Sequence, residues 1–528
     1  MPPAHTSLPL QWILLLGPLA GPAPPSEAPA PSPPAAAPAR AQSLAREGLK
    51  LIEADELVPA QAKLEEALGL DTKLPEAHYG LGFIHERRGE LEAARASYEA
   101  ALRGAPRMAE AHDRRGFVLG QLNRVEEAIA EFQSAVALKP DLFDAQYHLG
   151  ATLWWTKRPG ALGPLERAVT LRPDHPEARY YLALVVKQGG DLPKAIEYLR
   201  RALKASPQLV PAHLQLGLAL QEQGDLPSAV AELRRALELD PSSAEAANSL
   251  GLALIQKGEA EEAVATLQTL VDRHPDYLVG RHNLGSALLQ KADLEGAIAV
   301  YRDLARRAPD SAEAFYNLGL ALKQKDDFPA AEAELRRAMA LDPKLPEAPY
   351  TLSVMLWQTG RPSEALPLLQ KVVELKPDYA EARYMLGTVL KQQGDAEGAL
   401  REFRETIKYQ PGSIEAHLSL GQLLQQRKDA AGAAAAFAEA DRLSKKRADA
   451  QAATLAVGVG LQKLKDHDPA GALDRFREAV RLDPENAQAH FQLAIALAAG
   501  GAREEARAHF QAAHRLAPYL QAPEPPRP

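Results

Sequence analysis

Small and bulky hydrophobic residues recur along this chain at intervals that fit one face of each of two successive helices. In segment 109–142, Gly116, Ala128 and Phe132 stand at positions 8, 20 and 24 of the segment. Neighbours on a helix face lie three or four residues apart, so this spacing is typical of buried faces. A short polar turn, such as residues 393–395 in a later segment, separates the two halves. The pattern predicts a helix–turn–helix unit in which the small residues allow close packing.

This unit is repeated along most of the chain. Segment 380–413 has Gly387, Ala399 and Phe403 at the same three positions. A proline in a context such as LKP, LRP or LDP recurs every 34 residues, with one step of 33, at Pro106, Pro140, Pro173, Pro207, Pro241, Pro275, Pro309, Pro343, Pro377, Pro411, and again at Pro484 and Pro518. We count fourteen such repeats between Ala41 and Leu520, and a fixed period of this length is typical of repeat architectures.

The repeats resemble the tetratricopeptide repeat, a helix–turn–helix of 34 residues that carries Leu-Gly, alanine, an aromatic residue, alanine and proline at these positions. The resemblance covers the chain from Ala41 to Leu520. It implies an all-α fold, a right-handed superhelical solenoid of antiparallel helix pairs. It also implies a concave groove, lined mainly by the first helix of each pair, in which protein or peptide partners bind.

Two places depart from the regular pattern. Repeat 4 lacks one residue, which alignment with repeat 10 places in the turn between Pro159 and Gly160, so we expect both of its helices to be intact. Its turn also has Lys157 where repeat 10 has Gly360. After Ser444 the expected proline is missing and about five extra residues precede the next repeat, which predicts a long helix or a kink.

The first forty residues differ from the rest. Residues 8–20 form an apolar run that is too short to span a bilayer, and a Pro/Ala-rich tract follows it. A secretory signal followed by a disordered linker is our preferred interpretation, although no Lys or Arg precedes the run; a low-complexity leader is the alternative. The expected organisation is therefore leader and linker 1–40, repeats 1–12 at 41–447, an irregular seam at 448–452, repeats 13–14 at 453–520, and a disordered tail at 521–528.

Composition and charge exclude several classes of function. The net charge of −8 gives no electrostatic reason to expect nucleic acid binding, which needs clustered Lys and Arg. Cysteine is absent from the sequence, which excludes disulfides, thiol catalysis and cysteine zinc sites. We find no nucleotide-binding, serine-hydrolase or zinc-protease motif, and the histidines recur at a packing position of the repeat. We therefore expect no enzyme activity, no cofactor, no metal site and no integral membrane span.

The candidate partner-binding residues stand on the predicted first helices. Position 5 is aromatic in many repeats and position 13 is often glutamine, which suits sequence-tolerant hydrogen bonding to an extended peptide. The pattern of Lys, Arg and Asn that binds chaperone tails is absent, and only two residues match the asparagine ladder of O-GlcNAc transferases. The candidates are the tryptophans Trp154, Trp155 and Trp357, the tyrosines Tyr147, Tyr180, Tyr316, Tyr350 and Tyr384, and the asparagines Asn283 and Asn317.

Two interpretations of the tryptophans stay open. Trp154 and Trp357 stand at position 12 and Trp155 at position 13, where family geometry predicts the groove wall. They are either partner anchors, as Trp often is at interfaces, or rings packed against the next repeat. We expect a non-enzymatic protein–protein interaction scaffold, secreted or periplasmic, with a cytoplasmic location as the alternative. The alternative function is a non-catalytic subunit of an enzyme complex, similar to the repeat region of O-GlcNAc transferases without their catalytic domain.

Overall fold

The computed structural model describes residues 36–520, and within that range the chain consists of 27 helices joined by short turns. The predicted leader, most of the linker and the tail 521–528 lie outside the described residues. Fourteen helix pairs would give 28 helices, and the number is one lower because two successive helices are fused into α24 (Ala430–Lys465). The all-α fold of paired helices predicted from the sequence is confirmed.

The chain forms two compact units that divide between Ala219 and Leu220, within α11. The helices up to that division are α1 (Ala36–Glu53), α2 (Leu57–Leu70), α3 (Pro75–Arg87), α4 (Leu91–Gly104), α5 (Ala109–Gln121), α6 (Val125–Leu138), α7 (Phe143–Trp155), α8 (Leu162–Leu171), α9 (Pro176–Gln188), α10 (Leu192–Ala205) and α11 (Val210–Gln223).

The second unit continues the same alternation of first and second helices. Its helices are α12 (Leu226–Leu239), α13 (Ala244–Lys257), α14 (Ala260–Arg273), α15 (Leu278–Gln290), α16 (Leu294–Arg307), α17 (Ala312–Gln324), α18 (Phe328–Leu341), α19 (Glu347–Gln358), α20 (Pro362–Leu375), α21 (Ala380–Gln392), α22 (Ala396–Tyr409), α23 (Ile414–Gln426), α24, α25 (Pro469–Leu482), α26 (Ala487–Ala499) and α27 (Arg503–Leu516).

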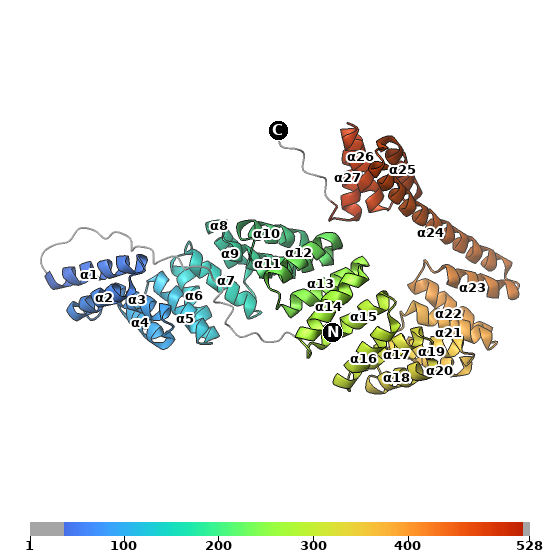
Figure 1. Ribbon diagram of the computed structural model, residues 1–528, viewed down its shortest axis with the longest axis horizontal. Helices are drawn as coiled ribbons and strands as arrows, with labels where there is room; N and C mark the ends of the chain where they lie inside the picture. Colours follow the sequence, from blue (N-terminus) through green and yellow to red (C-terminus); the bar gives the residue numbers. More distant parts are fainter. Residues whose placement is uncertain (1–35, 521–528) are drawn as a thin grey trace. The chain divides into compact units, whose positions relative to one another are not determined.

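Within each unit, a second helix packs against its own first helix and against the first helix of the next repeat, as α4 does with α3 and α5 (Figure 1). The four largest fully buried side chains stand at position 24: Tyr98, Tyr301, Phe403 and Phe476. Each ring lies against the small residue at position 8, so that a Cβ added to Gly387 would come within 2.7 Å of Phe403 Cε1. The predicted close packing of each pair is therefore present.

The turn between paired helices has one conformational signature. In every described repeat the residue at position 15 has a positive φ, which glycine adopts at little cost. Gly360 fills this position in repeat 10, whereas repeat 4 has Lys157 with φ +56°. An aspartate at the next residue, position 16, often caps the second helix, as Asp395 does by accepting a hydrogen bond from the Gly398 N–H at 2.8 Å.

Two expectations about boundaries need correction. Helix α1 begins at Ala36, so residues 36–40 are helical and do not belong to a disordered linker. Alanine favours helix, and Arg40 forms an ion pair with Glu66 of α2 at 3.2 Å. The deletion in repeat 4 also shortens its second helix: α8 has 10 residues where α6 has 14, and Gly160, with φ +95°, lies in the non-helical stretch before it.

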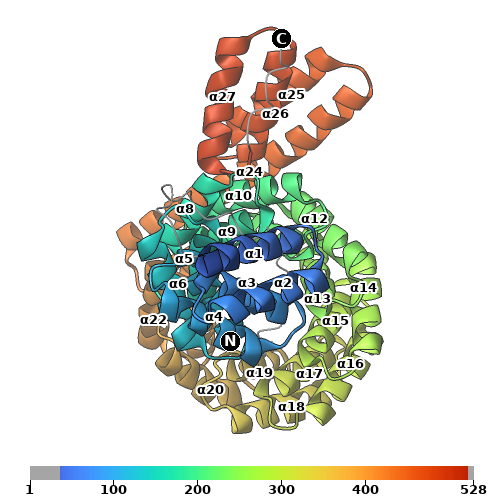
Figure 2. The ribbon, with the colours of Figure 1, turned by 90° about the vertical axis from the view of Figure 1, so that its left-hand side faces the viewer.

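The seam after repeat 12 is one continuous helix. α24 has 36 residues and runs through Lys445, Lys446 and Arg447 without a break. The sequence predicted either a long helix or a kink at this point, and the structure shows the long helix. Figure 2 shows α25, α26 and α27 packed side by side beside the C-terminal part of α24. No described helix is both long and apolar enough to cross a membrane.

Candidate binding surface on the first helices

Side chains of successive first helices are joined by hydrogen bonds with a fixed register. In three places a residue at position 5 bonds to the residue at position 6 of the next repeat, 35 residues later. In this way Nδ1 of His148 donates to Asp113 at 2.8 Å, Asn283 Nδ2 donates to Asn248 at 2.7 Å, and Asn317 Nδ2 donates to His282 at 3.2 Å. These bonds tie together the first helices of repeats 3 and 4, of repeats 7 and 8, and of repeats 8 and 9.

A second set of hydrogen bonds lies at positions 12 and 13 of the first helices. Gln221 Nε2 donates to Gln256 Oε1 at 3.0 Å, and the Trp357 indole N–H donates to Gln392 Oε1 at 2.9 Å. Gln290 Nε2 donates to the Ile255 carbonyl at 2.8 Å. Seven glutamines at position 13, in repeat 5 and in repeats 7 to 12, are exposed: Gln188, Gln256, Gln290, Gln324, Gln358, Gln392 and Gln426. These seven exposed residues form the glutamine row.

Repeats 2 to 4 contain a buried ionic cluster at the same face. The Tyr98 hydroxyl donates to Glu86 at 2.7 Å, and Arg114 lies 3.3 Å from the other oxygen of that carboxylate. Burial raises the pKa of the Glu86 carboxyl, while Arg114 opposes the shift. Burial lowers the pKa of the His148 imidazole and the Asp113 carboxylate raises it, with a net upward shift. The cluster joins three repeats through ion pairs and hydrogen bonds among buried groups, which favours a structural role.

The tryptophan pair of repeat 4 divides into one packed ring and one exposed ring. Trp154 is half-buried and meets the ring of Tyr181, on the first helix of repeat 5, edge to face at 5.7 Å. Trp155 has 38% of its surface exposed, and its ring centroid lies 6.3 Å from that of Trp154. Trp357 is half-buried and is held by its bond to Gln392. Trp155 is therefore the tryptophan of the three that can offer a large contact area.

Two predicted site residues lie in the interior. Tyr147 is 3% exposed and packs against Phe143, at 5.8 Å, and His175, at 5.2 Å. Asn283 is 6% exposed and is bonded to Asn248. Both residues were expected on the surface of the groove. The structure shows that they are buried, because the neighbouring repeat covers each of them. The other predicted residues are half-exposed: Tyr180, Tyr316, Tyr350, Tyr384 and Asn317.

The sequence did not single out several residues that build this face. Tyr181 supports Trp154, and His282 and Asn248 complete the bonds between positions 5 and 6. A signal was present for Tyr181 and His282, because each stands at position 5 or 6 next to a residue that was singled out, Tyr180 or Asn283. The pairing between position 5 of one repeat and position 6 of the next depends on the stacking of repeats, which the period alone does not specify.

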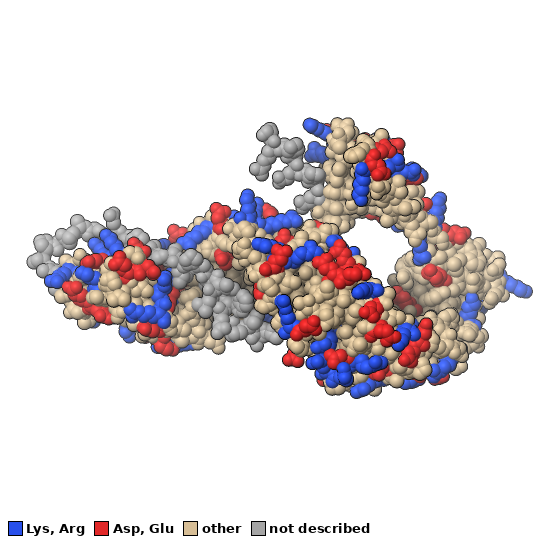
Figure 3. All heavy atoms as spheres, viewed as in Figure 1, with Lys and Arg blue, Asp and Glu red and all other residues tan. Residues whose placement is uncertain are grey.

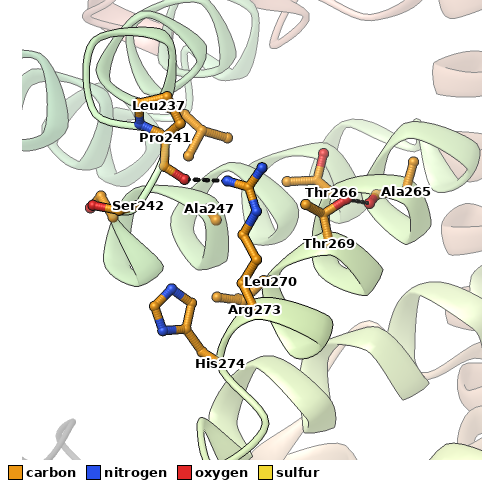
Figure 4. A pocket seen from close by; sticks show the side chains of 11 residues that line it. Leu237, Pro241, Ser242, Ala247, Ala265, Thr266, Thr269, Leu270, Arg273 and His274 are labelled. Atoms are coloured by element: carbon orange, nitrogen blue, oxygen red, sulfur yellow. Dashed lines mark hydrogen bonds between the residues drawn. The ribbon is translucent and has the colours of Figure 1, made fainter.

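A pocket of about 380 Å³ lies away from this face, between α12, α13 and α14 (Figure 4). Arg273 crosses it and donates through Nη1 to the Pro241 carbonyl at 2.6 Å. The Thr269 hydroxyl donates to the Ala265 carbonyl at 2.9 Å. These polar groups serve the backbone and tie repeat 7 to the end of repeat 6, so the pocket supports a structural role.

The charged side chains of the described surface are mixed in sign. In the view of Figure 3, Lys and Arg side chains are interspersed with Asp and Glu side chains over the visible surface. Among residues 36–520, no group of three or more His, Asp or Glu side chains could hold a metal ion. The face offers amides, aromatic rings and mixed charges, which is the chemistry of a polypeptide-binding surface.

Comparison with protein-family models finds tetratricopeptide repeat models along the chain. One matches residues 59–109, 157–210, 214–277, 282–346, 384–453 and 460–520, which together are more than half of the chain. A second tetratricopeptide repeat model matches residues 356–401, and a further repeat model of this kind matches 118–154. Among curated proteins no sequence match was found.

Solved structures that match this chain cover it to different extents. Yeast Tom70 is 15% identical, with a TM-score of 0.40, over 74% of this chain and 96% of its own. A tetratricopeptide repeat protein from Parabacteroides merdae is 17% identical, with a TM-score of 0.41, over 47% of this chain and 99% of its own. MamA from Desulfovibrio magneticus is 25% identical, with a TM-score of 0.30, over 32% of this chain and 96% of its own.

Proposed function

The chain belongs to the tetratricopeptide repeat family, and we propose that it is a non-enzymatic scaffold that binds polypeptide partners along its first helices. Proteins built only from this repeat are generally not catalytic, and proteins of the family bind other proteins. The proposal rests on the side chains of this chain as well as on its family, because the first helices carry the exposed groups suited to such binding.

The glutamine row is the observation that carries the proposal. A primary amide both donates and accepts hydrogen bonds, so a row of exposed amides can pair with the backbone of an extended peptide whatever its sequence. The row has one glutamine in repeat 5 and one in each of repeats 7 to 12, whereas repeat 6 has Glu222 at this position. A partner bound in this way would lie along several repeats, and its affinity would be distributed over many modest contacts.

Trp155 is the proposed anchor of the bound segment. It replaces glutamine at position 13 of repeat 4, and 38% of its surface is exposed. Large aromatic side chains dominate the binding energy of many interfaces, because they bury much apolar area at little cost in conformational entropy. Trp154 holds Trp155 from one side and is itself supported by Tyr181.

Export is a separate proposal, supported only by the apolar run at residues 8–20. It would place the scaffold in the periplasm or outside the cell; retention in the cytoplasm is the alternative. The alternative function, a non-catalytic subunit, differs in its partners. A subunit would co-purify with one fixed catalytic protein, whereas a scaffold would recover several partners that share a first-helix contact.

The test is affinity purification of partners with the full chain and two variants. Trp155→Ala with Gln188→Ala removes the anchor and one neighbouring amide. Val58→Ala is the control, because Val58 is 74% exposed on a second helix. We expect the double variant to lose partners that the wild type and the control retain. Equal recovery by all three proteins, or turnover of substrate by the purified chain alone, would contradict the proposal.

A further inference from the structure

Helix α24 interrupts the stacking of repeats within the second unit. Its first part is the second helix of repeat 12, and its last part is the first helix of repeat 13. Elsewhere the chain reverses between these two elements, as at residues 410–413 between α22 and α23. At 1.5 Å per residue its 36 residues span about 54 Å, so the two parts point the same way along one axis.

The side of repeat 13 that should meet the preceding repeat is consequently uncovered. At positions 3 and 7 of the inner repeats stand small residues and leucines that are buried, such as Ala314 at 1% and Leu318 at 2% exposed. The same positions of repeat 13 carry Leu455, which is 70% exposed, and Val459, which is 38% exposed. Leu455 and Val459 are called the leading face of repeat 13.

The leading face is apolar, unlike the corresponding face of repeat 1. Repeat 1, which no described helix precedes, has Ser43 and Glu47 at positions 3 and 7, and both are exposed. Polar residues of this kind are what uncovered repeats need for solubility. Repeat 13 has leucine and valine there instead. Exposed apolar residues at positions that other repeats use for stacking indicate a binding face.

Repeat 12 carries a matching uncovered side. Leu418, at position 5, is 38% exposed, whereas Asn248 at that position of repeat 7 is 8% exposed beneath the next repeat. Ala434, at position 21, is exposed, whereas Ile298 and Leu400 are buried there. Leu418 and Ala434 are called the trailing face of repeat 12. It is the side that, in a regular array, would cover the leading face of repeat 13.

The sizes of the side chains on the two faces are complementary. Between repeats 7 and 8 a small residue meets a large one: a Cβ added to Gly280, at position 3, would lie 2.7 Å from Leu270, at position 27 of the preceding repeat. At the seam the sizes are reversed. Leu455 is a large residue at position 3, and the exposed Ala434 is a small residue at position 21, where Ile298 and Leu400 stand in other repeats. Exchanging volumes across a packed contact preserves its fit.

We propose that the leading face of repeat 13 packs against the trailing face of repeat 12 in a second copy of this chain. The continuous α24 keeps the two faces of one chain apart, so each is available to the other copy. The exchange is reciprocal, since each chain supplies both faces, and it closes as a two-fold symmetric dimer. The repeat pattern identifies the partner. Elsewhere in this chain, a leading face is covered by the trailing face of the preceding repeat, so a second copy can supply the same kind of surface.

The molecular mass of the full chain in solution is the first test, measured by light scattering after size-exclusion chromatography. We expect twice the mass of one 57.0 kDa chain. Leu455→Glu with Val459→Glu should reduce it to one chain, with the helical circular dichroism retained. The control is Val58→Glu, which adds a charge at an exposed valine of α2 and should stay dimeric. A monomeric wild type, or a dimer that survives the double substitution, overturns the proposal.

Disulfide cross-linking tests the geometry, because the chain has no cysteine of its own. Positions 5 and 6 of successive repeats are bonded elsewhere, and across the seam these positions are Leu418 and Gly458. A side chain added at Gly458 would meet no atom within 4 Å. Oxidised Leu418→Cys/Gly458→Cys should give covalent dimers that neither single variant gives. A cross-link within one chain, or dimers of Gly458→Cys alone, overturns the exchanged arrangement.

Discussion

Nδ1 of His148 lies 2.8 Å from Oδ1 of Asp113, and this buried pair joins the first helices of repeats 3 and 4. His148 is 5% exposed and also packs against Phe117 and Phe132, at ring distances of 5.3 and 5.5 Å. Asp144 adds to the effect of Asp113 on the imidazolium and Arg114 opposes it. The contact between these repeats therefore depends on the charge of one imidazole.

The first prediction is a loss of stability between these repeats as the pH rises. Because the folded pKa of His148 is raised above its ordinary value of 6.5, the stabilising contribution is fully present below pH 6.5 and is lost as the pH rises through the folded pKa. Asp113→Asn should remove this pH dependence and, at low pH, about 1.5–3 kcal/mol of stability. Thermal unfolding followed by circular dichroism from pH 5.5 to 9 measures both. A wild type and variant with parallel pH profiles would refute this account.

The second prediction concerns the close approach of paired helices. Gly387→Ala should destabilise the chain by about 1–3 kcal/mol, because the added Cβ would lie 2.7 Å from Phe403 Cε1, and Phe403 is 0% exposed. The matched control is Gly69→Ala in α2, where no atom lies within 4 Å and alanine favours the helix. That variant should unfold at the same or a slightly higher temperature. Urea unfolding compares the two, and equal effects would show that the glycine is not needed for packing.

The third prediction concerns the turn of repeat 4. Lys157→Gly should stabilise the chain by about 1 kcal/mol, because a left-handed backbone costs a residue with a Cβ roughly 1–2 kcal/mol. Gly360→Ala, the reverse change at the same position of repeat 10, should destabilise it by a similar amount. Denaturant unfolding of the two variants gives the comparison. If Lys157→Gly lowers the stability instead, the lysine side chain contributes more than its backbone costs.

The fourth prediction separates Tyr147 from the binding residues. Its hydroxyl is buried without a hydrogen-bond partner among the described residues. Burial also raises the pKa of this phenol. Tyr147→Phe should therefore leave the stability unchanged or raise it by about 1 kcal/mol, since it removes an unsatisfied polar atom and keeps the ring. Partner recovery should not change. A variant that folds normally and loses its partner would place the hydroxyl at the binding surface after all.

The sequence predicted the fold well because the fold is local. Gly387 and Phe403 are sixteen residues apart, and the same spacing repeated along the chain indicates the helix pair without knowledge of distant contacts. The sequence did not predict which polar residues of the first helices are covered. Asn283 is buried because Asn248 of the preceding repeat lies against it. That contact depends on how repeats stack, which the period leaves open.

The boundaries were less predictable for a related reason. The deletion in repeat 4 was assigned to the turn, yet α8 begins only at Leu162. An alignment counts residues, whereas the start of a helix depends on backbone conformation, here the positive φ of Gly160. At the seam, the missing proline removed the stop signal, but whether the helix would bend or continue depended on the packing of Ala453 and Ala456, which are buried.

The last prediction distinguishes the two adjacent tryptophans. Trp155→Ala should weaken partner binding by about 2 kcal/mol, or roughly thirtyfold, because an exposed anchor contributes mainly when a partner covers it. Trp154→Ala should mainly lower the melting temperature, because it removes a ring that packs edge to face on Tyr181. Calorimetric titration with a captured partner gives the affinity, and circular dichroism gives the melting temperature. Trp155→Phe is the conservative control and should keep most of the binding. If Trp155→Ala lowers the melting temperature as much as Trp154→Ala and leaves the affinity unchanged, both rings belong to the packing between repeats 4 and 5.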